Sequence, residues 1–133
     1  MDNVGEALRP SKQIATALDL FTGCGGLALG FEAAGFETIG YEMNLDGCNT
    51  YNENLTGRCQ QAVLTAATTF PSADIVIGGP PCQPFSVGGE QKGLKDTRDG
   101  FPAFISAVEQ VRPRLWLFEN VRGRALPHDP FQW

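Results

Sequence analysis

The sequence predicts an α/β fold with a mostly parallel sheet, and three observations predict it. Short apolar runs alternate along the chain with longer segments whose apolar residues have helical spacing. Clusters of glycine and proline separate many of these segments. The chain has 133 residues, 42% hydrophobic and 19% charged, which is enough for one globular domain with a buried core.

The expected elements alternate between strand and helix. The expected strands are residues 14–20, 37–42, 62–64, 74–77 and 115–118, and the expected helices are 27–34, 45–55 and about 99–111. Gly35 suits the left-handed position just past the first helix, and Pro102 suits the first turn of the last one. Gly47 weakens the second helix, and the strand at 62–64 has the weakest pattern. The loop at 79–99 has a length that in compact domains usually indicates either a functional lid or a disordered segment.

The domain is expected to cover residues 14–123, between an N-terminal extension at 1–13 and an unassigned tail at 124–133. No apolar run approaches the ~20 residues of a membrane span. The polar N-terminal extension lacks the apolar core of an export signal. We therefore expect a cytoplasmic protein without a membrane partner.

Cysteine spacing and charge exclude some classes of site. None of the four cysteines forms a CxxC pair, and the single histidine lies near the end, so we expect neither a metal site nor a disulfide framework. The net charge of −5 argues against strong nucleic-acid binding by this chain alone. A local basic strip could still form from residues of the second half. These are Lys92, Lys95, Arg98, Arg112, Arg114, Arg122 and Arg124.

Two segments suggest a site for a nucleoside. The run DLFTGCGGLALGFEAAGF, residues 19–36, leads from a strand through glycines into a helix, where backbone N–H groups can meet a ligand. Its glycines lack the GxGxxG spacing of the dinucleotide fingerprint, and a tight turn without a ligand is the alternative. Glu42 follows the next strand, about 20 residues beyond the glycine turn, where a carboxylate can accept hydrogen bonds from ribose hydroxyls. The alternative for Glu42 is a solvated charge.

Two later segments suggest covalent chemistry. In GGPPCQPFSVGG, residues 78–89, Cys82 lies between two prolines that stiffen the backbone directly after a strand. A thiol needs activation at neutral pH, and the absence of a nearby histidine disfavours a Cys–His hydrolase; a buried, inert cysteine is the alternative. In FENVRG, residues 118–123, Glu119 ends a strand expected to be buried, where desolvation would raise its pKa and keep a proton available. Its alternative is a carboxylate paired with an arginine.

These four segments, in this order, resemble the cytosine-5 DNA methyltransferase family, over residues of about 17 to 123. DLFTGCGG is similar to the family's first motif, GGPPCQPFS to its catalytic-loop motif and ENV to its acid motif. The resemblance implies a Rossmann-like fold, S-adenosylmethionine as the methyl donor, Cys82 as the nucleophile and Glu119 as the acid. It also implies a closing DNA-binding loop that includes Ser86. The implied cofactor-binding residues are Phe21, Gly23, Gly25, Gly26, Glu42, Met43, Gly79 and Pro81.

The resemblance also implies partners and an incomplete domain. The substrate would be double-stranded DNA with the target cytosine flipped out of the helix. The family continues well beyond Gly123, so we expect an incomplete fold that needs a complementing C-terminal chain with the target-recognition domain and is inactive without it. Near Gln61 the chain lacks the acid that usually contacts the adenine, a role that Gln61 could take. Alternatives are a non-catalytic remnant, a transfer RNA cytosine-5 methyltransferase and, last, a dinucleotide oxidoreductase.

Overall fold

The computed structural model describes residues 14–81 and 100–120 of the chain. Within these residues a five-stranded sheet has the strand order β3-β2-β1-β4-β5. Every pairing in it is parallel. The strands are β1 (Thr16–Leu20), β2 (Glu37–Glu42), β3 (Arg58–Gln61), β4 (Ile75–Gly78) and β5 (Leu115–Phe118), and the helices are α1 (Gly26–Ala33), α2 (Leu45–Asn54) and α3 (Phe101–Val111).

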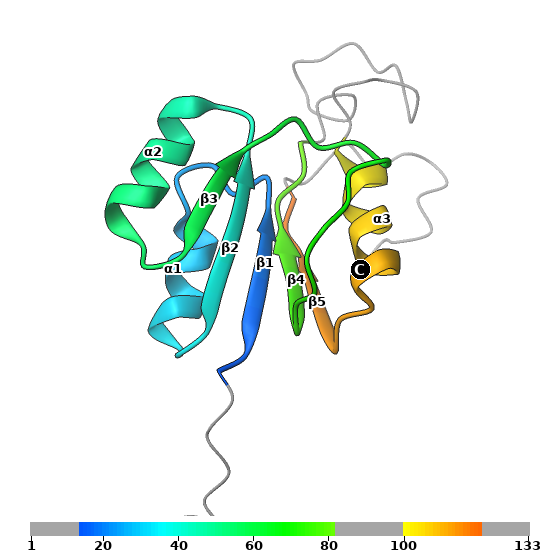
Figure 1. Cartoon of the computed structure of the whole chain (residues 1–133), viewed down its shortest axis with the longest axis horizontal. Helices are drawn as coiled ribbons and strands as arrows, with labels where there is room; N and C mark the ends of the chain where they lie inside the picture. The colour runs from blue at the N-terminus through cyan, green and yellow to red at the C-terminus, as the bar shows by residue number, and fades with distance from the viewer. Residues whose placement is uncertain (1–13, 82–99, 121–133) are drawn as a thin grey trace, which may run out of the picture.

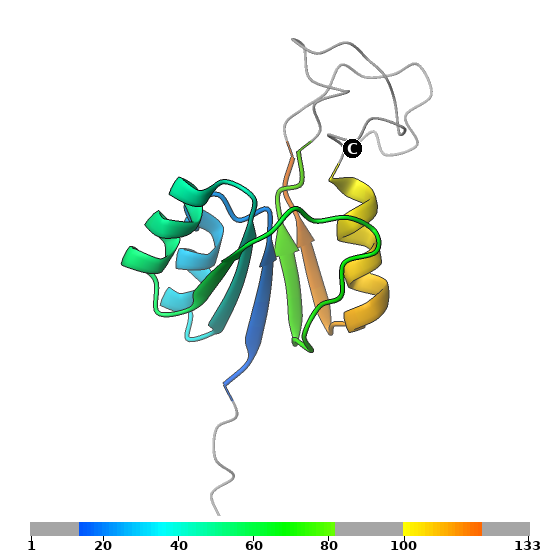
Figure 2. The ribbon, with the colours of Figure 1, turned by 45° about the horizontal axis from the view of Figure 1, so that its top comes forward.

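The helices form two layers around the sheet, with α1 and α2 beside β1, β2 and β3, and α3 beside β4 and β5 (Figures 1 and 2). Alternate residues of the central strands pack in opposite directions. Leu18 and Val76 pack in a cluster with Phe104 of α3. Ala17 and Ile77 belong to a second cluster with Leu27 of α1. The central strands are therefore apolar on both faces, as is usual for a parallel sheet.

The strand order reverses between β1 and β4. From β1 the chain proceeds outward through β2 to β3, and then returns to the other side of β1 with β4 and β5. Open α/β sheets bind ligands at such a switch point, beyond the carboxyl ends of the strands. The fold thus places the loops after β1 and β4 at a position suited to a ligand.

The predicted elements are confirmed with shifts of one or two residues at their ends, except for the third strand. That strand was expected at 62–64 but lies at Arg58–Gln61, so the prediction was wrong. Asn52 of α2 explains the position, because its side chain bonds both the N–H and the carbonyl of Cys59, at 2.9 and 3.2 Å. Cys59 is the buried residue of a polar edge strand, RCQQ, which shows almost no apolar pattern in the sequence.

Candidate cofactor and catalytic site

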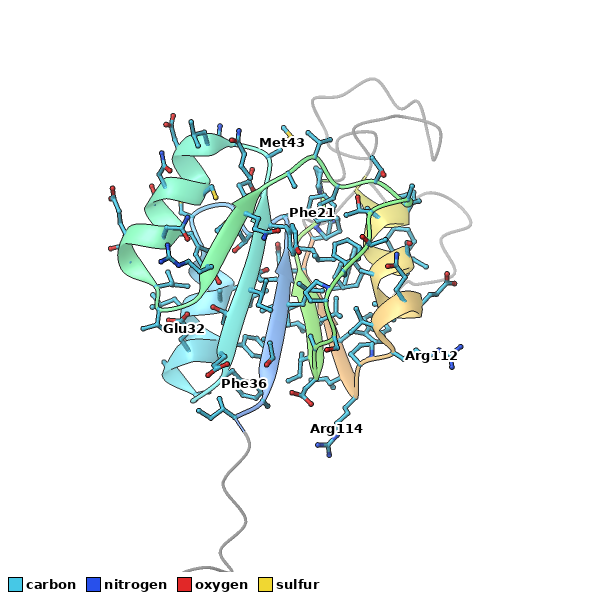
Figure 3. All side chains as sticks on the ribbon, viewed as in Figure 1. Phe21, Glu32, Phe36, Met43, Arg112 and Arg114 are labelled. Atoms are coloured by element: carbon cyan, nitrogen blue, oxygen red, sulfur yellow. The ribbon has the colours of Figure 1, made fainter. Side chains whose placement is uncertain are left out.

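The described residues with predicted roles lie at the carboxyl edge of the sheet. Phe21 and Met43 lie at this edge, whereas Phe36 and Arg114 lie at the opposite end (Figure 3). The β4 and β5 strands end at the same edge, because Gly78 pairs with Leu20 on one side and with Phe118 on the other.

The turn after β1 has an unusual backbone. Phe21, Gly23 and Gly25 have positive φ angles of 58°, 56° and 90°. A positive φ is rare for a residue as bulky as phenylalanine, and such strain gathers at functional sites. Thr22 secures the turn, since its N–H donates to the carbonyl of Tyr41 at 3.1 Å and its carbonyl accepts from Gly25 N–H at 2.9 Å.

Gly25 is required by packing as well as by its backbone angle. A Cβ added at this position would lie 2.6 Å from Cδ2 of Tyr51 and 3.2 Å from Cδ1 of Leu55. Tyr51 is fully buried, and its hydroxyl donates to Thr38 Oγ1 at 2.6 Å. Gly26 differs, because nothing lies within 4 Å of a Cβ added there. Gly25 therefore serves the fold, whereas the open side of Gly26 leaves room for a ligand to approach.

Glu42 joins the turn after β1 to the start of α2. One carboxylate oxygen accepts from Gly23 N–H at 2.9 Å, and the other accepts from Asn44 N–H at 2.8 Å. Each carboxylate oxygen can accept more than one hydrogen bond. Glu42 is thus held in a fixed orientation and retains the capacity to accept from two ribose hydroxyls.

Met43 and Gln61 lie side by side next to Glu42. Met43 is 67% exposed, so a flat base could cover its side chain. Gln61 is the register partner of Glu42, and its side-chain Nε2 donates to the carbonyl of Met43 at 3.2 Å. A carbonyl only accepts, so the amide nitrogen must face Met43, and Oε1 remains as the acceptor of that side chain.

Asp19 is a residue whose position sequence reasoning did not single out. It is buried beneath the turn with 1% of its surface exposed. Its carboxylate accepts from Thr22 Oγ1 at 2.5 Å and from the backbone N–H of Ala28. Burial raises the pKa of Asp19 to about 6, against the hydrogen bonds from Thr22 and Ala28, which lower it. The signal in the sequence was an acid within an otherwise apolar strand.

The residues that flank the predicted catalytic-loop segment meet beside the turn after β1. Cys82 and Ser86 lie outside the described residues. Their flanks are described: Gly100 N–H donates to the carbonyl of Pro81 at 3.1 Å. A Cβ added to Gly100 would lie 2.8 Å from Cζ of Phe21. The two described residues that flank the segment with the predicted nucleophile, Pro81 and Gly100, therefore lie beside Phe21.

Glu119 and Asn120 approach the same place from β5. Glu119 N–H donates to the carbonyl of Gly78 at 2.9 Å, and a Cβ added to Gly79 would lie 2.8 Å from Glu119 Oε2. Asn120, which sequence reasoning missed, donates from Nδ2 to the carbonyl of Pro80 at 3.2 Å. The expectation that Glu119 ends a buried strand was wrong, because β5 is an edge strand of the described sheet whose first three residues are exposed, and Glu119 itself is exposed.

The described residues also bear on the predicted basic strip, on metal binding and on membrane-spanning helices. Arg112 and Arg114 lie at the end of the sheet opposite Phe21 and Met43, so they add no basic strip to this site (Figure 3). The other basic residues considered for that strip lie outside the described ranges. Residues 14–81 and 100–120 contain no group of three or more histidine, cysteine or acidic residues that could hold a metal ion. Over the same residues, no helix is long and apolar enough to cross a membrane.

Solved structures with the same fold include methyltransferases. The chain superposes on the DNMT2 of Spodoptera frugiperda with a TM-score of 0.61 and 24% sequence identity, over 82% of this chain and 36% of that one. At this identity the match supports the Rossmann-like methyltransferase fold. The predicted fold class is confirmed.

Sequence relatives identify the family. The chain is 56% identical over 107 residues to the Type II methyltransferase M.AplI of Arthrospira platensis, and 38% identical over 119 residues to M.AquIA of Picosynechococcus. Each match covers 80% of this chain but only 31% and 48% of the two relatives. The profile of the family described as C-5 cytosine-specific DNA methylase matches residues 15–129, which does not favour the transfer RNA alternative. The chain belongs to the C-5 cytosine-specific DNA methylase family.

Proposed function

We propose that this chain supplies the cofactor turn and the catalytic cysteine of a DNA methyltransferase that transfers a methyl group from S-adenosylmethionine to carbon 5 of cytosine. The convergence at one edge of the sheet carries this proposal: the strained turn at Phe21 and the carboxylate of Glu42 lie beside the anchored flanks of the Cys82 loop. The family and its Type II relatives support DNA as the substrate.

The described residues fit the nucleoside of the cofactor. Glu42 has acceptor capacity for the ribose hydroxyls, and the exposed side chain of Met43 offers an apolar surface for the purine. Gln61 then takes the place of the usual adenine-contacting acid, because its Oε1 can accept from the amino group of adenine. Gly79 and Pro81 would border the methionine end of the molecule.

The chemistry begins at Cys82. Its thiolate adds to carbon 6 of a flipped cytosine and moves electron density to carbon 5, while Glu119 donates a hydrogen bond or proton to ring nitrogen 3. Bound S-adenosylmethionine supplies an electrophilic methyl group. Carbon 5 would take that methyl group and release its proton to solvent. Elimination of the Cys82 thiolate, with return of any proton on ring nitrogen 3 to Glu119, then restores the aromatic ring.

A covalent trap tests the nucleophile. The chain is combined with a C-terminal fragment of a related methyltransferase, with S-adenosylmethionine and with DNA that contains 5-fluorocytosine, from which fluorine cannot leave as a proton does after methyl transfer. We expect an adduct that maps to Cys82 and disappears in Cys82→Ser, whereas Cys24→Ser, at an exposed cysteine, retains it. An adduct at Cys24, Cys48 or Cys59 would contradict the assignment.

The acid is tested by Glu119→Gln in the same complemented enzyme. We expect single-turnover methyl transfer to slow by about 10²–10⁴-fold, the usual effect of losing such a group. Asn120→Ala serves as a comparison, because it removes the bond to the Pro80 carbonyl but leaves the carboxyl in place. A rate for Glu119→Gln close to that of the unchanged enzyme would assign Glu119 a structural role.

We further propose that the chain methylates DNA only with a complementing polypeptide. It spans less than half of the relatives' length, and its net charge of −5 offers few phosphate contacts to offset the few kcal/mol needed to flip a base. Leu115 and Leu117 of the edge strand β5 are 57% and 41% exposed, which suits a surface that a further part of the domain covers.

A tritiated-methyl transfer assay on unmethylated genomic DNA tests complementation, with and without the C-terminal fragment. We expect incorporation only in the mixture. Replacement of Leu117 by Glu, which places a charge on the proposed contact, should abolish complementation, whereas Leu29→Glu on the exposed side of α1 should preserve it. Robust incorporation by the chain alone would refute the need for a partner. The absence of incorporation in every mixture would favour a non-catalytic remnant.

A further inference from the structure

We propose that Asp19 is a positioning residue for the S-adenosyl nucleoside: it holds the cofactor turn from below, so that ligand affinity depends on a side chain that does not touch the ligand. The inference rests on the proposed function for its ligand. The hydrogen bonds of Asp19 on which it depends lie within the described residues, so they can be tested in the protein without ligand.

The Asp19 carboxylate connects two parts of the turn. Thr22, within the turn, donates from Oγ1 at 2.5 Å, and Ala28, in the first turn of α1, donates its backbone N–H. Asp19 is the register partner of Gly40 on β2 and of Ile77 on β4, so it belongs to the centre of the sheet. The turn is therefore tied at both ends to a rigid strand.

Packing explains why an acid on β1 performs this task. A helix start normally receives a side-chain hydrogen bond from its own N-cap residue. Gly25 occupies the N-cap of α1 and has no side chain to offer, and the first turn of α1 contains no acid. Any larger residue at Gly25 would collide with the buried ring of Tyr51. Asp19 supplies the missing hydrogen-bond acceptor from the neighbouring strand.

Burial of Asp19 also lowers the stability of the folded chain, which a solvent-exposed capping residue would not do. Burial raises the pKa of Asp19 to about 6, so the ionised form destabilises the folded chain relative to a neutral side chain of the same shape. The titratable groups that act on it are Glu42 on β2, Tyr51 on α2 and Cys59 on β3, and none of them carries a positive charge. A buried carboxylate with hydrogen-bond donors but no positive charge among the groups that act on it, next to a turn that could bind a ligand, is typical of a functional site.

Protonation changes the direction of one hydrogen bond of Asp19 but not the number of its partners. The ionised carboxylate accepts from the Thr22 hydroxyl and from Ala28 N–H. A protonated carboxyl can donate to the Thr22 hydroxyl from one oxygen and still accept from Ala28 N–H with the other. We therefore expect the turn, and the affinity for the ligand, to change little as the pH drops through about 6.

Four variants separate positioning from stability. Asp19→Ala removes both bonds, and Thr22→Val removes the hydroxyl but keeps the shape of the side chain. Asp19→Asn removes the titration, and its amide can still accept from Ala28 and donate to the hydroxyl of Thr22. Asp74→Asn is the matched control, because Asp74 accepts from Thr16 N–H at 2.8 Å at the opposite end of β1.

The first measurement is calorimetric binding of S-adenosylhomocysteine to the whole chain, well below the unfolding temperature, between pH 5 and pH 8. This probe has no group that titrates in that range. We expect affinity to stay within about threefold between pH 8 and pH 5 in the unchanged chain and in Asp74→Asn, because Asp19 holds both partners in either protonation state. In Asp19→Asn we expect affinity within about threefold of the unchanged chain across the same pH range. Asp19→Ala and Thr22→Val should bind at least tenfold more weakly at pH 8.

The second measurement is amide hydrogen exchange in the free chain. We expect Asp19→Ala and Thr22→Val to accelerate exchange of the Gly25 and Ala28 amides selectively, whereas Asp74→Asn, whose amide oxygen can still accept from Thr16 N–H, leaves these amides unchanged. Unchanged exchange at Gly25 and Ala28, or ligand affinity that is equal in all variants, would overturn the proposal. If the unchanged chain binds no S-adenosylhomocysteine even with the C-terminal fragment, the proposed function loses support. In that case the exchange result by itself decides whether Asp19 holds the turn.

Discussion

Replacement of Gly25 by alanine should unfold this domain far more readily than the same change at Gly26, one residue away. Gly25 has a φ of 90°, an angle that costs an alanine about 1–2 kcal/mol. The new Cβ would also lie 2.6 Å from Tyr51 Cδ2. Relief requires movement of a buried ring whose hydroxyl is bonded to Thr38 at 2.6 Å. Overpacking of this kind costs about 1–3 kcal/mol, so the total is about 2–5 kcal/mol.

Gly26 provides the control. Nothing lies within 4 Å of a Cβ added there, and Gly26 is the first residue of α1, where alanine is the better helix former. We expect Gly26→Ala to leave the free energy of unfolding unchanged or to raise it by up to about 1 kcal/mol. Because the open side of Gly26 faces the proposed ligand, this variant should nevertheless bind S-adenosylhomocysteine more weakly.

Urea unfolding followed by far-ultraviolet circular dichroism measures both variants, with thermal unfolding as a second readout. For a domain of this size, a loss of about 2–5 kcal/mol corresponds to a drop in Tm of roughly 8–20 °C or more. A free energy of unfolding for Gly25→Ala within about 0.5 kcal/mol of the unchanged chain would refute the reasoning, since such a value is typical of a surface substitution. Equal losses in both variants would show that the turn tolerates no side chain for reasons unrelated to Tyr51.

Three further predictions concern polar side chains that are held by hydrogen bonds. The pKa of Asp19 rises on folding from 3.8 to about 6, so the free energy of unfolding should decrease as pH rises through this window, by at most about 3 kcal/mol. Asp19→Asn should remove this decrease when urea unfolding is measured as a function of pH. Glu32 behaves oppositely: burial would raise its pKa, but hydrogen bonds from Thr38, Thr56 and Gly57 together lower it. Its contribution to the free energy of unfolding should therefore be lost as pH falls below about 4.5. Glu32→Gln should lower the free energy of unfolding by about 1–2 kcal/mol at pH 7. Tyr51→Phe removes the hydroxyl bond to Thr38 and should lower the free energy of unfolding by about 1–2 kcal/mol without weakening ligand binding, because the ring still fills the space beneath Gly25.

The strand-turn-helix pattern at the start of the domain could be predicted because local chemistry determines it. Gly35 ends α1 with a φ of 92°, as expected from the absence of a Cβ, and Pro102 lies in the first turn of α3. Apolar runs identified the buried strands β1 and β4 with shifts of one or two residues. The edge strand β3 was misplaced because its pairing depends on Asn52 of another element, which no pattern within the strand reports.

The sequence by itself determined the family, the glycine turn and the chemical types of the candidate residues, because these are properties of local runs such as DLFTGCGG and GGPPCQPFS. Only the tertiary structure decided which atoms face one another. It placed the Asp19 carboxylate under Thr22, directed the Gln61 amide nitrogen to the Met43 carbonyl, and left Glu119 exposed beside Gly79. These contacts join elements that are distant in the chain, and burial and hydrogen bonding depend on how the strands pack rather than on the residue types along any one of them.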